Sequence, residues 1–420
     1  MKKLLALILA FVMVATVFVS CGNNTADDEN SKKTEKQTEN DSEKDTQKET
    51  EKGTEKSTEN STDEAENNGN TENNGNTENG GNTENSGNQD GGEQGDVKPE
   101  VLYVRDGNKV TFGSYPQTAV TDTELIYTLN GKAGSLPKST NSYSWTSYGY
   151  YVGSVQIDYM WYIDVEEAGE KYRGVYFNAY RPFGIDELTA DELSYQDENG
   201  YVLETIYWFK YEPISWTVLK EDTANNSALI LCDMIMDAQC YQNESTQNSK
   251  DYKHYNTSEG VPSGIYANNY KYSTIRQWLN ETFMDTAFNK YEAEIILTTL
   301  VDNSAATTSA SVNENACENT EDKIFLLSYR DIINSEYGFV STQYSNDEAR
   351  AKKTTDYACA QGAWASTDEA YLGNGSWLLR SPDNGGTATV RCVTEKGYDF
   401  SLVPTKNVAR GVLPALQIKF

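Results

Sequence analysis

Residues 211–219 read Tyr-Glu-Pro-Ile-Ser-Trp-Thr-Val-Leu, and their pattern indicates the class of fold. Ile214, Trp216 and Val218 alternate with polar neighbours, as the side chains of a half-buried strand do. A few residues later, 228–232 form an unbroken apolar run, which is typical of a fully buried strand. Turn-forming Gly, Asn and Asp residues are abundant around both segments. The pattern predicts a sheet-based domain rather than a helical one.

Short alternating segments continue on both sides of this stretch. Further strands are expected at 109–113, 158–163, 172–177, 201–210, 324–327, 377–380, 388–393 and 411–418. Thr274 and Gln277 have the spacing of a capping box, and apolar residues at 275–283 share one face, so a helix is expected there. A second helix is expected at 290–300 and a short one near Ser328. We therefore predict an α+β fold of mostly short antiparallel strands with two or three helices.

Composition separates this domain from what precedes it. The 420 residues carry a net charge of −29, which disfavours binding to nucleic-acid phosphates. Residues 22–96 contain 21 acids, 7 lysines and no aromatic residue, in repeats rich in Thr, Asn and Gly. Such a segment has nothing to bury, so we predict a disordered, acidic tether at 21–96. Residues 97–420 are predicted to form a single domain with an insertion around 118–200.

Residues 1–20 have the features of a lipoprotein signal peptide. Two lysines precede an apolar run, 4–19, that is shorter than the roughly 18–20 residues of a spanning helix. Phe18-Val19-Ser20-Cys21 resembles a bacterial lipobox, which implies cleavage before Cys21 and a diacylglyceryl group on its sulfur. Two acyl chains are enough for stable anchoring. We expect Cys21 to tie the chain to the extracellular face of the bacterial cytoplasmic membrane. A secreted protein with a chance cysteine, or an uncleaved anchor, is the alternative.

Six motifs carry a resemblance to one family. They read FGSYPQ at 112–117, YEPISWTVL at 211–219, IRQWLN at 275–280, IFLLS at 324–328, WLLRSP at 377–382 and GVLPAL at 411–416. In this order they resemble the bacterial family called domain of unknown function 6273, found mainly in surface proteins of anaerobic Gram-positive bacteria. The resemblance covers nearly all of 108–420. Leu413 departs from the family, which usually has arginine at that position.

Two of these motifs also suggest a fold. The Trp-x-x-Arg-Ser segment at Trp377 and the terminal Gly-Val-x-Pro-Ala segment at Gly411 are similar to those of C-type lectin-like domains and the formylglycine-generating-enzyme superfamily. This resemblance implies a C-type-lectin-like fold, and a fold does not by itself assign a function. The chain lacks the Glu-Pro-Asn and Trp-Asn-Asp triplets of calcium-bound sugar sites, and the close cysteine pair of the oxidase branch. Neither chemistry is expected.

Common catalytic motifs are missing from the sequence. His254 is the only histidine and lies in a polar segment, so a surface role is more probable than general-base chemistry. No His-Glu-x-x-His or Gly-x-Ser-x-Gly motif occurs. Ser135 and Lys138 match Ser-x-x-Lys, but Pro137 between them argues against the helical turn that this motif needs. We predict no catalytic residue, no metal site and no cofactor.

Cysteine usage leaves the redox state open. Removal of Cys21 with its lipid leaves an odd number, Cys232, Cys240, Cys317, Cys359 and Cys392. Bridges between Cys232 and Cys240 or between Cys359 and Cys392 are compatible with an extracellular location, but spacing does not establish either.

Aromatic residues supply the candidate binding site. Residues 143–162 are crowded with Tyr and Trp, and sugar rings stack on such faces. Trp145, Tyr148 and Trp161 are therefore candidate ligand contacts, with Trp377 and Arg380 as a second pair in which arginine clamps the ligand. The competing interpretation is that the aromatics are ordinary core residues and that Arg380 forms a buried ion pair.

These observations predict a lipid-anchored surface protein that displays a lectin-like domain for glycans of the wall, the host or the diet. One alternative is an envelope hydrolase acting on carbohydrate or peptide, which would need two carboxylates about 5–9 Å apart across a cleft. Another is a module that binds an envelope protein through an exposed apolar patch.

Overall fold

The computed structural model describes residues 98–137, 144–148, 150–152, 155–181, 194–242, 265–309, 315–383, 386–405 and 410–420. All of them belong to one compact unit, bounded by Gly91 and Phe420. The predicted signal peptide, Cys21, the predicted tether and His254 lie outside the described residues.

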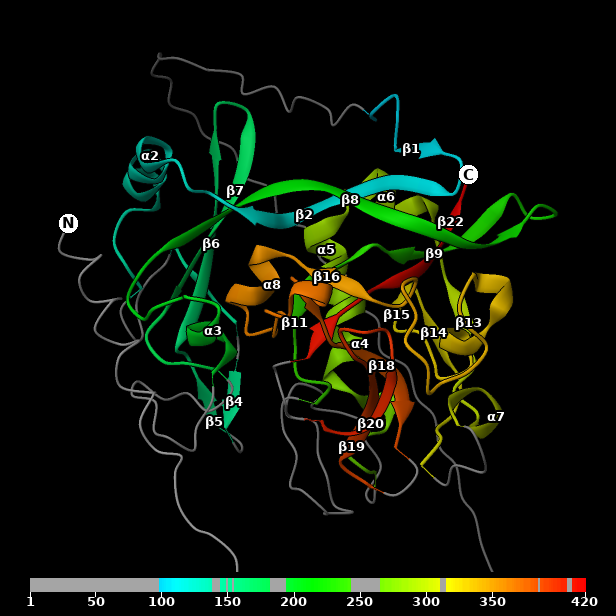
Figure 1. Cartoon of the computed structure of the whole chain (residues 1–420). Coiled ribbons are helices and arrows are strands. Elements are labelled where there is room, and N and C mark those ends of the chain that lie inside the picture. Colours follow the sequence, from blue (N-terminus) through cyan, green and yellow to red (C-terminus); the bar gives the residue numbers. More distant parts are fainter. Residues whose placement is uncertain are drawn as a thin grey trace, which may run out of the picture. The chain divides into compact units, whose positions relative to one another are not determined.

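The largest element of the described residues is a ten-stranded antiparallel sheet. Its strands are β1 (Tyr103–Asp106), β2 (Lys109–Ala119), β3 (Thr146–Ser147), β6 (Met160–Glu167), β7 (Glu170–Phe177), β8 (Tyr207–Asp222), β9 (Ser227–Cys232), β12 (Ile296–Leu297), β15 (Ile324–Phe325) and β22 (Ala415–Lys419). The main order is β12-β22-β9-β8-β7-β6-β3, and β2 also pairs with β8, β1 with β2 and β15 with β22. In Figure 1, β2 and β8 run together across the top of the domain.

Smaller sheets complete the strand structure. A five-stranded sheet has the order β11 (Asp237–Ala238), β21 (Gly411–Val412), β18 (Trp377–Pro382), β19 (Thr389–Val393) and β20 (Asp399–Pro404). A three-stranded sheet has the order β10 (Met234–Ile235), β16 (Lys352–Thr354) and β17 (Asn374–Gly375). The two remaining pairs are β4 (Tyr150–Val152) with β5 (Val155–Ile157) and β13 (Thr299–Val301) with β14 (Thr320–Asp322).

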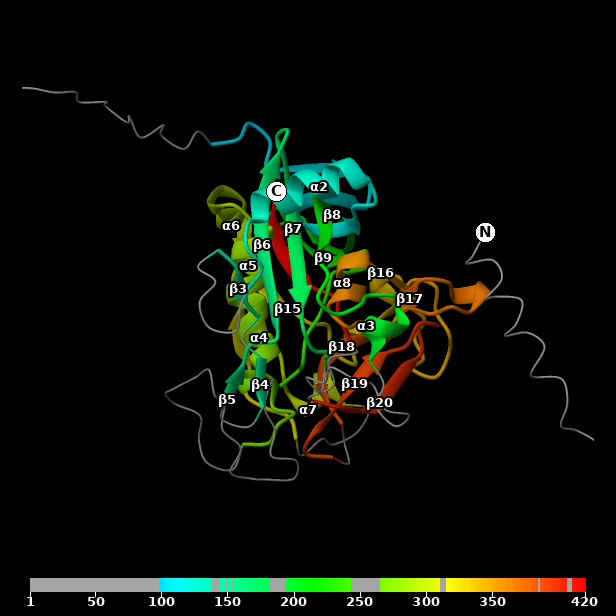
Figure 2. The same ribbon diagram turned by 90° about the vertical axis from the view of Figure 1, so that its left-hand side faces the viewer.

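The helical segments are short. They are α2 (Thr123–Ala133), α3 (Tyr195–Glu198), α4 (Thr274–Trp278), the π-helical turn η2 (Leu279–Phe283), α5 (Met284–Ala287), α6 (Lys290–Ile295), α7 (Ala305–Thr308), α8 (Asp356–Ala360) and the 3₁₀ turns η1 (Tyr270–Tyr272), η3 (Asp331–Ile333), η4 (Ser335–Tyr337) and η5 (Glu369–Tyr371). Figure 2 shows α4, α5 and α6 following one another along one side. The strand-rich architecture confirms the α+β class, and α2, α3, α7 and α8 are helices that the sequence pattern did not indicate.

Strand β8 follows its predicted alternation until a bulge interrupts it. Ile214 and Trp216 are fully buried, but the register shifts between Val218 and Lys220, so that Leu219 is buried and Val218 only half-buried. A bulge inserts one residue and moves the following side chains to the other face. The strand predicted at 201–210 is wrong in its first part, since 201–206 are not in a strand and β8 begins at Tyr207.

Helix boundaries differ from the predictions in two places. Ser273, rather than Thr274, caps α4, because its hydroxyl accepts a hydrogen bond from the Arg276 amide at 3.3 Å. The predicted capping box is therefore wrong. A capping box forms instead between Asn289 and Glu292 at α6. That helix ends at Ile295 because the following residues pair with β22 and β14 as strands β12 and β13.

The segment predicted to be an insertion lies largely between β2 and β8 in the sequence. It supplies α2, α3 and β3 to β7, and β7 pairs directly with β8, so the insertion widens the main sheet. Its aromatic residues bury one another in a separate apolar cluster of Leu129, Ala133, Trp145, Trp161, Val165, Tyr172, Tyr176 and Trp208.

We expect Trp216→Ala to lower the free energy of unfolding by about 3–5 kcal/mol, as removal of a buried indole does. Trp216 is fully buried, and its Nε1 donates to the Phe112 carbonyl at 2.8 Å. Urea unfolding followed by circular dichroism measures the change. Tyr127→Ala is the control, because that side chain is 83% exposed and its loss should alter stability by about 0.5 kcal/mol or less. Equal destabilisation by both variants would contradict the placement of Trp216 in the core.

Candidate functional site

Trp145 and Trp161 lie inside the insertion cluster. Each is 5% exposed, and their rings pack against Tyr176 with centroid separations of 6.3 and 5.9 Å. Trp145 also donates from Nε1 to the Ser135 carbonyl at 3.1 Å. Because their ring faces are covered, a ligand cannot stack on them in this structure. Their contacts match the competing interpretation of these residues as part of the core.

Trp377 and Arg380 are also buried. Trp377 is fully buried and donates from Nε1 to the Arg350 carbonyl at 3.0 Å. Arg380 is 4% exposed, and its Nη1 donates at 2.8 Å to both the Leu326 carbonyl and Asp331 Oδ2. The guanidinium is therefore held by internal partners. Leu413, where the family usually has arginine, is fully buried and contributes to the same apolar core.

Tyr148 has a different environment, because it lines a cavity of about 510 Å³. The cavity lies where β3, β6 and β7 of the insertion meet β2, β11, α8 and the helical segment α4–η2. Its walls are formed by Tyr115, Thr146, Ser147, Tyr148, Tyr162, Arg173, Asp237, Gln239, Cys240, Thr274, Gln277, Trp278, Glu281, Thr282 and Tyr357. Side chains from segments up to about 240 residues apart thus meet at one site, which the chain order alone does not reveal.

A buried carboxylate, Asp237, forms part of the cavity wall. Asp237 is 1% exposed and accepts hydrogen bonds from the Tyr115 hydroxyl at 2.6 Å, Gln239 Nε2 at 2.9 Å and the Ala238 amide at 2.7 Å. Burial raises the pKa of Asp237, and these three donors oppose that shift because they favour the charged form. Burial outweighs these donors, so the net shift of the pKa is upward.

Two tyrosines join the insertion to the core at this cavity. The hydroxyls of Tyr148 and Tyr357 lie 3.0 Å apart, and Gln361 Nε2 donates to the Tyr148 hydroxyl at 2.7 Å. Burial raises the pKa of both phenols well above their ordinary value, so both stay neutral. Neutral hydroxyls can donate and accept, which suits them to a ligand with hydroxyl groups.

Arg173 is the cation that lines the cavity wall, and it is paired with Asp164. Its Nε and Nη2 donate to the two carboxylate oxygens of Asp164 at 2.7 and 2.9 Å, and its guanidinium lies 4.2 Å from the centre of the Tyr162 ring. Lys171 approaches the same carboxylate at 3.2 Å, so two cations share it. Burial raises the pKa of Asp164, but Arg173, Lys171 and a hydrogen bond from Tyr211 together lower it more, so the net shift is downward. This two-point pairing fixes Arg173 as a structural cation.

One wall of the cavity is helical. Thr274, Gln277 and Trp278 come from α4, and Glu281 and Thr282 come from the π-helical turn η2 that follows it. A π-turn is rare and is often found at functional sites, because the extra residue redirects the side chains around it. Trp278 is half-buried, with its ring 5.5 Å from Phe283 and part of its surface open to the cavity.

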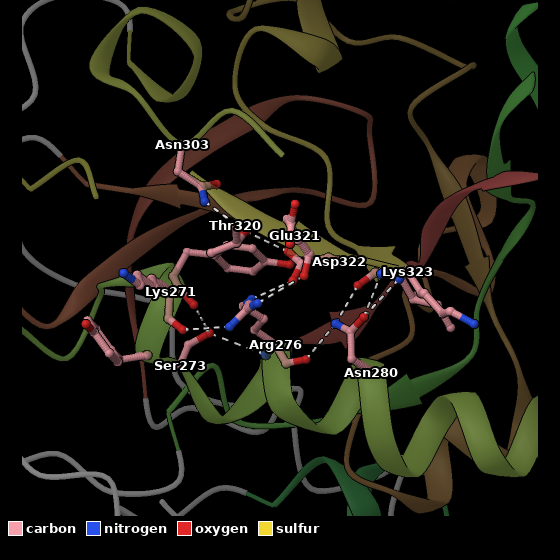
Figure 3. A network of polar contacts seen from close by, with 12 residues as sticks. Lys271, Ser273, Arg276, Asn280, Asn303, Thr320, Glu321, Asp322 and Lys323 are labelled. Atoms are coloured by element: carbon pink, nitrogen blue, oxygen red, sulfur yellow. Dashed lines mark hydrogen bonds and ion pairs between the residues drawn. The ribbon is translucent and has the colours of Figure 1, made fainter. Parts of the chain in front are cut away.

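The helical wall is fixed in place by polar contacts of Arg276 and Asn280 (Figure 3). Arg276 Nε donates to Asp322 Oδ1 at 2.6 Å, and its Nη1 donates to the Lys271 carbonyl at 3.0 Å. Asp322 is 1% exposed, and its second oxygen accepts from the Thr320 hydroxyl at 2.7 Å. A buried carboxylate with a cation and a hydroxyl as partners holds α4 against β14.

Asn280 closes the same network (Figure 3). Its Nδ2 donates to the Ile324 carbonyl at 2.9 Å, and its Oδ1 accepts from the amides of Lys323 and Ile324 at 2.8 and 3.1 Å. In the motif at 275–280, Ile275 and Leu279 enter the core, and Arg276 and Asn280 anchor the helix. Gln277 and Trp278 face the cavity.

Among the described residues there is no metal site, neither of the two disulfides and no membrane-spanning helix. These residues contain no group of three or more His, Cys, Asp or Glu side chains placed to hold a metal ion. Cys232, Cys317, Cys359 and Cys392 have free thiols, so neither of the two disulfides considered above forms in this structure. No helix in the part of the chain that the structure describes is long and apolar enough to cross a membrane.

A match to a family model covers part of the cavity wall. Residues 225–420 match the model of a family described as Domain of unknown function (DUF6273). This supports the family that the motifs indicated, over a shorter range than the predicted 108–420, since the motifs at 112–117 and 211–219 lie before the match. Asp237, the helical wall and Tyr357 lie within the matched range, whereas Tyr115, Tyr148 and Arg173 lie before it. No curated protein and no solved structure matches the chain.

Sequence reasoning missed most of the cavity. Of the candidate ligand contacts, only Tyr148 lies in it. Asp237 had a detectable signal, since it and Asp233 are the two acids of the otherwise apolar segment 228–238. Such an acid must find partners when it is buried. Trp278 was assigned to the hydrophobic face of its helix, where the π-turn leaves it only half-buried.

We expect Arg276→Ala to lower the free energy of unfolding by about 3 kcal/mol near neutral pH, because it leaves Asp322 buried without its cation. Burial already raises the pKa of Asp322. Without Arg276, the Asp322 carboxyl binds its proton more tightly in the folded state than in the unfolded state. The loss of stability should therefore shrink as pH falls from about 7 towards about 4.

Urea titrations at several pH values measure this effect. Lys271→Ala is the matched control, because Lys271 pairs with Glu318, whose side chain is 80% exposed, and such pairs contribute about 1 kcal/mol or less. A loss of stability in Arg276→Ala that stays constant with pH would contradict the role given to Asp322.

Proposed function

We propose that this chain is a lipid-anchored surface lipoprotein whose domain binds carbohydrate, and that the sugar occupies the 510 Å³ cavity. The observation that carries the proposal is the combination of aromatic faces and hydrogen-bonding groups around one cavity. Its volume falls within the range of about 300–1,000 Å³ that is common for small-molecule sites. The C-type-lectin-like fold expected from the sequence is part of the same proposal.

The cavity wall suits a sugar chemically. Trp278, Tyr148 and Tyr162 offer aromatic rings, on which the C–H faces of a sugar can pack. Gln239 and Gln277 offer amides that can both donate to and accept from ring hydroxyls. Three threonines and one serine add further hydroxyls around the opening. A ligand with alternating apolar faces and hydroxyl groups would satisfy both kinds of surface.

The hydrolase alternative has weaker support. A glycosidase needs one carboxyl group that gives a proton and a second carboxylate across the bond to be cleaved. Asp237 is 1% exposed and already accepts three hydrogen bonds, and Glu281 is exposed at the opening and accepts from Gln277 at 3.1 Å. Binding without hydrolysis is the function that this arrangement favours.

A plugged cavity tests the binding site. We expect the full chain to bind members of an array of wall, host and plant glycans, with binding unchanged by EDTA, and Thr146→Trp to abolish it by filling the opening from an exposed position. Trp278→Ala should weaken binding about tenfold or more, as loss of a stacking aromatic does. Isothermal calorimetry on an array hit measures both variants.

Tyr344→Ala is the control, since Tyr344 is 70% exposed and does not line the cavity. Binding that survives in Thr146→Trp would place the ligand elsewhere on the domain. Silence across the array would remove the glycan proposal and favour a protein partner.

Metabolic labelling tests the anchor. We expect Cys21→Ser to abolish incorporation of labelled palmitate in the expressing bacterium and to release the protein from the membrane fraction, because the sulfur that would carry the diacylglyceryl group is gone. Cys317→Ser should retain the label and is the matched control. Label retained in Cys21→Ser would contradict the lipoprotein assignment.

A further inference from the structure

We infer that the ligand of this cavity carries a protonated amine, so that, resting on the proposed function, the preferred sugar is one with free amino groups, such as a de-N-acetylated hexosamine. The inference rests on three observations of the cavity and its domain: the charges in the wall, the aromatic rings beside them, and the charge of the domain around them.

The first observation is an excess of negative charge in the wall. Asp237 and Glu281 are the two acids that line the cavity, against one lining cation, Arg173. Arg173 donates two hydrogen bonds to Asp164 and lies over the Tyr162 ring, so its guanidinium is engaged within the wall. A cationic ligand therefore meets one acid at the opening and another inside.

The charged form of Asp237 is also favoured from outside the cavity wall, although burial leaves the net shift of its pKa upward. Besides its three hydrogen-bond donors, the buried Arg181 lies close enough to lower the pKa of this carboxyl, partly offsetting the effect of burial. Arg181 does not line the cavity, and its Nη1 donates to the carbonyl and side-chain oxygens of Gln361 at 3.0 and 3.1 Å. It stabilises the carboxylate without standing between Asp237 and a ligand.

The second observation is the aromatic content of the wall. Five rings line the cavity, Tyr115, Tyr148, Tyr162, Trp278 and Tyr357. The faces of such rings attract cations, and aromatic residues beside carboxylates are a recurrent way to bind ammonium groups. The domain already uses this interaction with its own cations, since Arg173 lies over Tyr162 and Lys171 lies 4.1 Å from the centre of the Tyr211 ring.

The third observation is the charge of the domain. Residues 97–420 contain 43 acids and 26 basic side chains, which gives a net charge of 26 − 43 = −17. A field of this sign raises the local concentration of cations and increases the rate at which they reach a site. An N-acetyl group abolishes the positive charge of the sugar, so only the free amine benefits from the field and the two carboxylates.

The experiment compares two probes that differ only in this charge. Glucosamine oligomers and N-acetylglucosamine oligomers of equal length are titrated into the full chain, with intrinsic tryptophan fluorescence and calorimetry as readouts. We expect the glucosamine oligomer to bind about tenfold or more tightly than the N-acetylglucosamine oligomer. A buried charge-assisted hydrogen bond contributes a gain in affinity of this size. Raising the salt concentration should weaken the amine complex and leave the neutral one unchanged.

Two variants connect the preference to the carboxylates. Glu281→Gln keeps the shape of an exposed side chain and should reduce the preference for the amine by up to about fivefold, the usual range for an exposed ion pair. Asp237→Asn should remove most of the rest. Glu348→Gln, an exposed acid that does not line the cavity, should leave the preference intact. Since Glu281 is exposed, its variant folds even where Asp237→Asn does not.

The outcomes separate this inference from the proposed function. Equal affinity for both oligomers, or a preference untouched by Glu281→Gln and by salt, overturns the amine inference and leaves carbohydrate binding in place. A third probe, choline, carries the cation without a sugar. A calorimetric response to choline but to neither oligomer overturns carbohydrate binding while keeping the selection for cations. A preference for glucosamine oligomers that falls in both carboxylate variants supports the inference.

Discussion

Pairing between β2 and β8 is the constraint on which the rest of the domain depends. The register runs from Lys109 opposite Thr217 to Ala119 opposite Phe209, so the two ends of the insertion are fixed side by side. Because β7 then pairs with β8, the insertion has to extend the sheet rather than hang from it as a loop. That placement brings Tyr148, Tyr162 and Arg173 to the cavity. The site is thus a consequence of sheet topology, as sites between structural layers often are.

The opposite wall depends on a local irregularity. A regular α-helix through 274–287 would keep its apolar residues on one face, and the π-turn at 279–283 shifts that face by one residue. Arg276 and Asn280 hold the helix on either side of the point where the turn begins. The cost of the irregular turn is therefore offset by a charged hydrogen-bond network, which leaves Gln277 and Trp278 available to the cavity.

The sequence predicted most strands of the main sheet, but it did not predict several of the helices or the site. Alternation at Ile214 and Trp216 predicted β8 correctly because burial on one face has a two-residue period. The same pattern misplaced Val218, since a bulge leaves no mark in the hydrophobic pattern. Trp145 and Trp161 could not be told from binding residues, because an aromatic face is functional or structural depending on what covers it. Their cover is Tyr176, which lies in a different strand.

The cavity wall has two parts, one from the range that matches the family model and one from the insertion. Asp237, the helical wall and Tyr357 belong to the range that matches the family model, and each is tied into the core by buried contacts. Tyr148 and Tyr162 come from the insertion, and the contact between Tyr148 and Tyr357 joins the two parts at the cavity. A substitution in the insertion can therefore reshape the opening while Asp237 keeps all three of its donors. Core residues would then set the preference for ligand charge, and residues of the insertion would set the shape of the opening. Substitutions in the two parts would act independently, as substitutions of residues that share no partner generally do.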